Sequence, residues 1–118
     1  MSKSNTFEND LLLLIFNNTD IANIGDAGGL QNSAAAGDLY VALHTADPGE
    51  AGTAATSEAT YGSYDRVAVA RSGAGWTVAG NSATNAALVQ FPECTSGSET
   101  ITHVSITVGG TPTTADKI

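Results

Sequence analysis

The stretch Asp38–Ala51, DLYVALHTADPGEA, decides the fold. Its first half, Leu39–Thr45, is rich in β-branched and aromatic residues, which predicts a strand. This strand is apolar on both faces, so we expect it to be central in a sheet. A turn follows at Pro48-Gly49, because proline fixes φ and glycine accepts a positive φ. The next residues, 52–63, are small and polar and predict a long surface loop.

The rest of the C-terminal part alternates strand-like runs with turn signals. Further strands are expected at 64–72, 76–79, 86–91 and 101–108. In the last of these, Val104, Ile106 and Val108 are predicted to face the core, while the residues between them face solvent. Short strands separated by Gly, Pro and Ser turns, with no helix between them, predict a mainly β fold. The expected architecture is an antiparallel β-sandwich, jelly-roll-like, with an N-terminal α-helix.

The helix is predicted over residues 5–17, with Asn5 and Glu8 forming a capping-box-like start. Its apolar residues extend most of the way round the circumference, which is wider than the stripe of an ordinary surface helix. Two interpretations follow. The helix simply packs on the sheet, or part of it docks against a neighbouring subunit, with Leu12 and Phe16 as the candidate contacts.

The length of 118 residues predicts one domain covering residues 1–118. Within it we expect the helix at 5–17, a connector at 18–37 and the sandwich at 38–118. The uncharged stretch Ser72–Pro92 indicates a surface covered by another chain. Trp76 lies within this stretch, either as a core residue or as an exposed contact residue.

The net negative charge of the chain disfavours some classes of binding partner. The chain has 4 Lys and Arg against 12 Asp and Glu, a net charge of −8. A nucleic-acid partner is not expected, because binding phosphates needs a basic face. The loop acids Asp47, Glu50 and Glu58 are instead candidates for contact with a basic protein surface. The apolar run at 11–16 is far shorter than the ~20 residues that cross a bilayer, so no membrane segment is expected.

Motifs for catalysis and metal binding are missing from the sequence. His44 and His103 lack the spacing of metal ligands, so no metal or other cofactor is expected. Serine, histidine and aspartate occur without a nucleophile elbow, and an enzyme is not expected. The single cysteine, Cys94, is predicted to be a buried structural thiol.

Four blocks of the chain carry a family resemblance: FENDLLLLIFNNTDIANIGDAGGL from Phe7, LYVALHTADPGEAG from Leu39, TSEATYGSYDRVAVARSGAGWTV from Thr56 and FPECTSGSETITHVSI from Phe91. Together and in this order they resemble a family of tailed-bacteriophage genomes whose members are labelled phage tail fibre or virion proteins. Similar sequences run on past the equivalent of Lys117-Ile118 with further strand-like segments. Two interpretations follow: this member is short, or the sequence stops before the last strands of the sandwich.

The resemblance implies a non-catalytic structural component of a phage virion, made in the bacterial cytoplasm. The expected partners are other virion proteins, either major capsid or tail proteins, in a homo-oligomer or symmetric assembly. An outward-facing head decoration is favoured, since the chain is short and lacks the repeats of long fibres. The alternative is a tail-fibre-type module that recognises host-surface glycans through loops 47–63 and 95–99.

Overall fold

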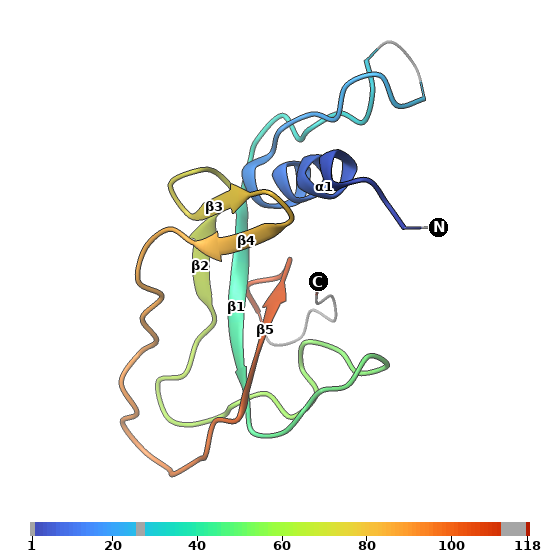
Figure 1. Cartoon of the computed structure of the whole chain (residues 1–118). Helices are drawn as coiled ribbons and strands as arrows, with labels where there is room; N and C mark the ends of the chain where they lie inside the picture. The colour runs from blue at the N-terminus through green and yellow to red at the C-terminus, as the bar shows by residue number, and fades with distance from the viewer. Residues whose placement is uncertain (1, 26–27, 112–117) are drawn as a thin grey trace. The chain divides into compact units, whose positions relative to one another are not determined.

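The computed structural model describes residues 2–25, 28–111 and 118 (Figure 1). Within these residues the chain forms one helix and five strands. They are α1 (Asn5–Asn17), β1 (Asp38–His44), β2 (Val67–Ala70), β3 (Trp76–Ala79), β4 (Ser82–Asn85) and β5 (His103–Thr107). One sheet has the order β2-β1-β5, and β3 pairs with β4 in a second sheet. The predicted fold class, mainly β with antiparallel sheets and an N-terminal helix, is confirmed.

The chain divides into two compact units. The helical unit comprises residues 1–37 and 70–88, and the sheet unit comprises residues 38–69 and 89–118. The two sheets lie in different units, so the face-to-face packing of a jelly-roll-like sandwich stays a prediction. The single domain expected from the length of the chain also stays a prediction.

Helix α1 occupies the predicted residues, but its N-cap is Ser4 rather than Asn5. The Ser4 side chain accepts a hydrogen bond from the Phe7 N–H at 3.2 Å, which satisfies one of the free donors of the first turn. Asn18 ends the helix in the left-handed conformation, with φ of 54°. In the part of the chain that the structure describes, no helix has the length and apolarity needed to cross a bilayer.

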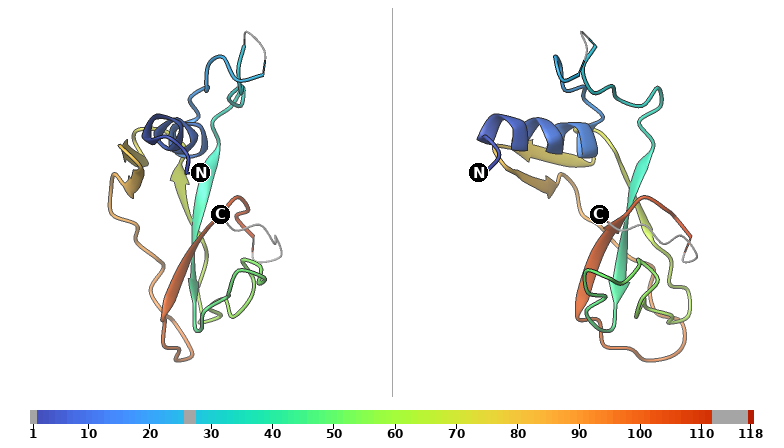
Figure 2. Two further views of the ribbon diagram at one scale, coloured as in Figure 1. Left: turned by 45° about the vertical axis from the view of Figure 1, so that its right-hand side comes forward. Right: turned by 90° about the vertical axis from the view of Figure 1, so that its right-hand side faces the viewer.

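In the helical unit, α1 lies beside the β3–β4 hairpin (Figure 2). The Phe16 and Trp76 rings pack edge to face with centroids 4.9 Å apart. The predicted strand at 86–91 is wrong, because β4 forms earlier, at Ser82–Asn85. Gly80 has φ of 62° and lets the chain reverse within two residues, so β3 pairs with the residues directly after the turn.

In the sheet unit, β1 is central, as predicted, and pairs with β5 in an antiparallel register that places Ala42 opposite Ser105. The predicted orientation of β5 is wrong. Thr107 is fully buried and Ser105 is 9% exposed, whereas Val104 and Val108 are 66% and 52% exposed. Strand alternation allows only one set of side chains to face the core, so β5 turns its polar set inward.

Buried His44 explains this orientation. Its ring is completely buried, with Nε2 2.8 Å from the Ser105 Oγ and Nδ1 2.9 Å from the Thr56 carbonyl oxygen. An apolar residue at position 105 would leave one ring nitrogen unpaired, at a cost of about 1–3 kcal/mol. The inward face of β5 is therefore polar because the facing strand β1 carries a buried imidazole.

The predicted surface loop at 52–63 is in part a core element. Ala54 is completely buried and Ala59 is 3% exposed. The loop follows β1 through main-chain hydrogen bonds, from the Thr45 N–H to the Ser57 carbonyl and from the Ala59 N–H to the Leu43 carbonyl. Small side chains let this segment pack closely on the strand, and the same small side chains made it resemble a free loop in the sequence.

Candidate interaction site

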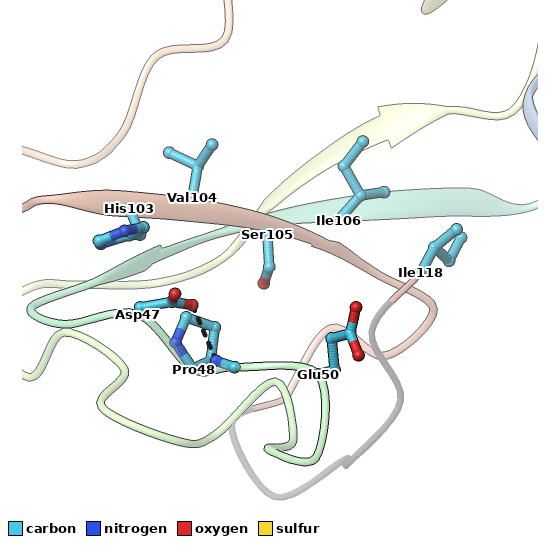
Figure 3. Close-up of a pocket in the computed structure, with 9 residues that line it drawn as sticks. Asp47, Pro48, Glu50, His103, Val104, Ser105, Ile106 and Ile118 are labelled. Atoms are coloured by element: carbon cyan, nitrogen blue, oxygen red, sulfur yellow. Dashed lines mark hydrogen bonds between the residues drawn. The ribbon is translucent and has the colours of Figure 1, made fainter.

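An open groove lies between β5 and the turn that follows β1. Its volume is about 660 Å³. Figure 3 shows the Ser105 side chain pointing toward the turn, while Val104 and Ile106 point the opposite way. The Asp47 carboxylate accepts a hydrogen bond from the Gly49 N–H at 2.8 Å, which fixes the turn. The groove is lined by Asp47, Pro48, Gly49, Glu50, His103, Val104, Ser105, Ile106 and Ile118.

Two of the predicted contact acids, Asp47 and Glu50, are exposed at this groove. Among the described lining residues there is neither a lysine nor an arginine. The described lining residues thus carry two carboxylates on a largely aliphatic surface and no compensating base, so their own contribution to the local potential is negative. The groove is therefore suited to a ligand that carries positive charge beside apolar groups.

The third predicted acid, Glu58, lies elsewhere, inside the sheet unit. Arg66 donates to both of its carboxylate oxygens, from Nε at 2.7 Å and from Nη2 at 2.8 Å, and the Tyr64 hydroxyl donates at 2.8 Å. The Arg66 and Glu58 side chains are 0% and 5% exposed. Both carboxylate oxygens of Glu58 thus accept hydrogen bonds from side chains of its own chain. Of the three acids predicted to contact a basic partner, only Asp47 and Glu50 remain exposed.

The pKa shifts of Glu58, Tyr64 and Arg66 agree with this geometry. Burial opposes ionisation of Glu58, but the hydrogen bonds from Arg66 and Tyr64 outweigh it and lower the pKa of the carboxyl. Burial, together with the hydrogen bond to Glu58, raises the pKa of Tyr64. The hydrogen bond to Glu58 raises the pKa of Arg66. The cluster is an ion pair at neutral pH and contributes to the fold of the sheet unit.

The two loops predicted for glycan recognition are bound to each other. The Glu99 carboxylate accepts hydrogen bonds from the Thr60 hydroxyl at 2.7 Å and from the N–H groups of Thr60 and Tyr61 at 2.8 and 3.0 Å. These bonds lower the pKa of Glu99. A Cβ on Gly62 would collide with Ser96, so glycine allows the loops to approach. Many polar groups of these loops therefore serve the fold.

The predicted contact residues of the helical unit differ in exposure. Phe16 and Trp76 are core residues, 7% and 4% exposed, so a partner cannot contact their side chains directly. Leu12 is half-buried and lines a second, smaller groove of about 330 Å³ with Leu11, Lys3, Glu8 and Asn81. Of the three, Leu12 is the residue that a partner can reach directly.

The histidines and the cysteine form no cluster of metal-ligating side chains in the described residues. His44 and His103 face each other across β1 and β5, but no group of three metal-ligating side chains forms there. Cys94 is exposed, so the prediction of a buried thiol is wrong. Its Sγ lies 3.3 Å from the Ser96 carbonyl oxygen, in a segment without the strand that was expected to bury it.

Comparison with known proteins gives one family. The model of the family described as Podophage GP4 fiber I protein gp80 matches residues 2–112. No curated protein and no solved structure matches the chain. The match covers the helix, both sheets and every residue that lines the groove except Ile118.

Proposed function

The chain belongs to the family described as Podophage GP4 fiber I protein gp80, and from this premise we propose that it is a non-catalytic structural module of a virion fibre, attached to other virion proteins through surfaces that its own fold leaves open. The family is one of phage fibre structural proteins. This agrees with the resemblance seen in the sequence and supports a location on the virion.

One observation carries the proposal. Val104 in β5 and Val108 just after it are exposed, while Ser105 and Thr107 of β5 are buried. Leu88, in the uncharged stretch, is 84% exposed. His44 accounts for the polar interior of β5 but not for the exposed aliphatic side chains. Apolar groups held open on a small domain are typical of a protein that associates with partners.

The fibre is the proposed location on the particle. The family description supports it, while the short, repeat-free sequence favours a head decoration. An epitope tag ahead of Ser2, followed by gold labelling of intact particles, separates the two. Label on tail-associated fibres is the expected result. Label spread over the capsid surface would favour the decoration, and purified particles without label would contradict a virion component.

Helix α1 is proposed as one attachment surface, through Leu12. Leu12→Asn should reduce incorporation into particles while leaving the melting temperature of the purified protein nearly unchanged, since Leu12 is only half-buried. Phe16→Asn is the matched control, and it should lower both because Phe16 packs on Trp76. Unchanged incorporation of Leu12→Asn would remove α1 from the attachment surface.

Glycan recognition is the second candidate. It is favoured by the junction of loops 47–63 and 95–99, where Tyr61 and Tyr64 pack edge to face with centroids 5.3 Å apart. It is opposed by the use of Glu99 and Thr60 in bonds between the loops. A glycan array with the purified protein discriminates the candidates, because a purely structural module should give no specific signal.

A further inference from the structure

In the described residues, the groove beside β5 has a main-chain edge that is only partly paired. β5 pairs only with β1 in its sheet, so it is an edge strand. The Ile106 carbonyl accepts a hydrogen bond from the Ile118 N–H at 2.7 Å, on the side away from β1. Alternate residues of an antiparallel strand turn their main-chain groups the same way. The N–H and C=O of Val104 therefore also point to the outer edge.

The main-chain groups of Val104 on this edge have no partner among the described residues. An edge strand with open main-chain groups is a template for an added strand. The Ile118 N–H already donates to the Ile106 carbonyl on this edge, so a main-chain hydrogen bond to the outer edge of β5 is sterically possible.

The chemistry of the groove defines what can be added. Asp47 and Glu50 are exposed along its other side, opposite β5 (Figure 3). Side chains of an added strand alternate, so one set of them would face the carboxylates and the other set would lie beyond the opposite face of the sheet, where Val104 projects. The matching segment has lysine or arginine alternating with aliphatic residues.

We propose that the groove between β5 and the Asp47–Glu50 turn binds an extended, basic segment of another virion protein, which pairs with the edge of β5 at Val104 and places its cations on Asp47 and Glu50. This deepens the proposed function by naming the partner chemistry. Nucleic acid does not fit, since the two carboxylates would repel its phosphates.

A second copy of this chain does not supply such a segment. Arg66 is buried on Glu58, and Arg71 donates to the carbonyls of Leu14 and Ile15. Among the described residues this leaves Lys3 as the one remaining lysine or arginine, ahead of α1. The full sequence has four Lys and Arg, at positions 3, 66, 71 and 117, and no run in which cations alternate. A strand with repeated cations therefore comes from a different protein.

The test uses purified full-length protein and three fluorescein-labelled eight-residue peptides. In the first, lysine alternates with valine. The second has glutamate in place of lysine, and the third keeps lysine but carries N-methyl groups on alternate peptide nitrogens, on the edge that would pair with β5. Fluorescence anisotropy should show binding of the lysine peptide alone, because the glutamate peptide is repelled and the N-methyl peptide cannot pair.

Variants locate the binding. Asp47→Asn combined with Glu50→Gln should weaken the lysine peptide about fivefold, the size expected for two exposed ion pairs, and 0.5 M salt should imitate the change. Asp38→Asn combined with Glu93→Gln removes the same charge from exposed positions of the sheet unit outside the groove and should leave affinity unchanged.

Several results would overturn the inference. They are equal binding of lysine and glutamate peptides, undiminished binding of the N-methyl peptide, equal loss in the two double variants, or absence of binding at millimolar peptide. Concentration-dependent self-association that Asp47→Asn/Glu50→Gln abolishes would show that a second copy is the occupant instead. The gold-labelling result does not depend on any of these outcomes, so failure of the groove and failure of the fibre location are distinguishable.

Discussion

Each unit of the molecule is organised around one arginine, and the two arginines are used differently. In the helical unit, Arg71 donates to neutral groups, the carbonyls of Leu14 and Ile15 at 2.8 and 2.7 Å, where α1 ends without a basic residue of its own. In the sheet unit, Arg66 faces the carboxylate of Glu58. Arg71 thus places a positive charge at the negative, C-terminal end of the α1 dipole, whereas Arg66 neutralises the buried charge of Glu58.

The interiors around these arginines differ in the same way. The helical unit buries Phe16, Trp76 and Ile21, a conventional apolar core. The sheet unit buries His44 and Thr107 among small and aliphatic residues. An apolar core tolerates small rearrangements, whereas a polar interior depends on every partner being present. The sheet unit should therefore be the part more sensitive to single substitutions and to pH.

The largest expected effect comes from breaking the buried ion pair. Arg66→Met should lower the free energy of unfolding by about 3–5 kcal/mol, because it leaves the Glu58 carboxylate buried without its cation. Residue-resolved hydrogen exchange should show faster exchange in β1 and β5 than in α1. Adding Glu58→Met should recover part of the loss. Equal acceleration in both units would mean that they unfold together and would remove the contrast between them.

A somewhat smaller effect is expected from the apolar core. Phe16→Ala should lower the free energy of unfolding by about 3 kcal/mol through the cavity left against Trp76. Chemical denaturation followed by tryptophan fluorescence measures this change directly at the packed ring. Phe16→Leu, which keeps most of the volume, should lose clearly less. If both variants lose the same amount, packing volume is not what Phe16 contributes.

Arg71 should matter less than Arg66. Arg71→Met removes hydrogen bonds to the partly buried carbonyls of Leu14 and Ile15 but leaves no buried charge, so we expect a loss of about 2 kcal/mol. Circular dichroism at 222 nm should show fraying of α1 before the cooperative transition. A loss as large as that of Arg66→Met would contradict the distinction between neutral and charged partners.

These contrasts also show what the sequence could and could not predict. The helix, the central β1 and the hairpin strand β3 follow from local periodicity and turn residues, and each was predicted at or within a residue of its bounds. The inward face of β5 was missed because Ser105 is buried for the sake of His44, which lies 61 positions earlier. The prediction assumed that the aliphatic side chains of a strand face the core, and this assumption takes no account of a buried histidine far away in the sequence.

The candidate site was predicted in part for the same reason. Asp47 and Glu50 are exposed, as expected of acids in a loop, and their contact with a partner stays a prediction. Glu58 is identical in type, yet Arg66 draws it inside. The sequence did contain one hint. The chain has only four Lys and Arg residues, so an arginine within a strand-like run indicates a specific ion pair or hydrogen bond. The pairing itself is tertiary and leaves no local pattern.

Acid should affect the sheet unit first. The pKa of Glu58 lies below its ordinary value of 4.5, so its contribution to stability is fully present above about pH 4.5 and is lost as pH falls through the folded pKa. Unfolding free energy measured between pH 7 and 3 should fall in the lower part of that range. Carbon-detected NMR of the Glu58 carboxyl provides a direct check, and titration at or above pH 4.5 would contradict the sign.

The smallest effect is expected at the groove. Asp47→Asn combined with Glu50→Gln should change the free energy of unfolding by no more than about 0.5 kcal/mol, because both carboxylates are exposed and neither forms an ion pair with a described residue. Thermal melts of this variant and of Asp38→Asn/Glu93→Gln should coincide. A clear destabilisation would show that these acids serve the fold, as Glu58 does.

The interleaved path of the chain through the two units has a consequence for synthesis on the ribosome. The helical unit has all its residues once Leu88 has been added, but the sheet unit still lacks the 19 residues from 89 to 107 that end with β5. At ~5–20 residues per second this interval lasts ~1–4 s. Throughout it, β1 has no partner on one side and His44 has no Ser105. Termination within this interval would release a chain with a finished helical unit and an open strand edge, the form most prone to aggregate.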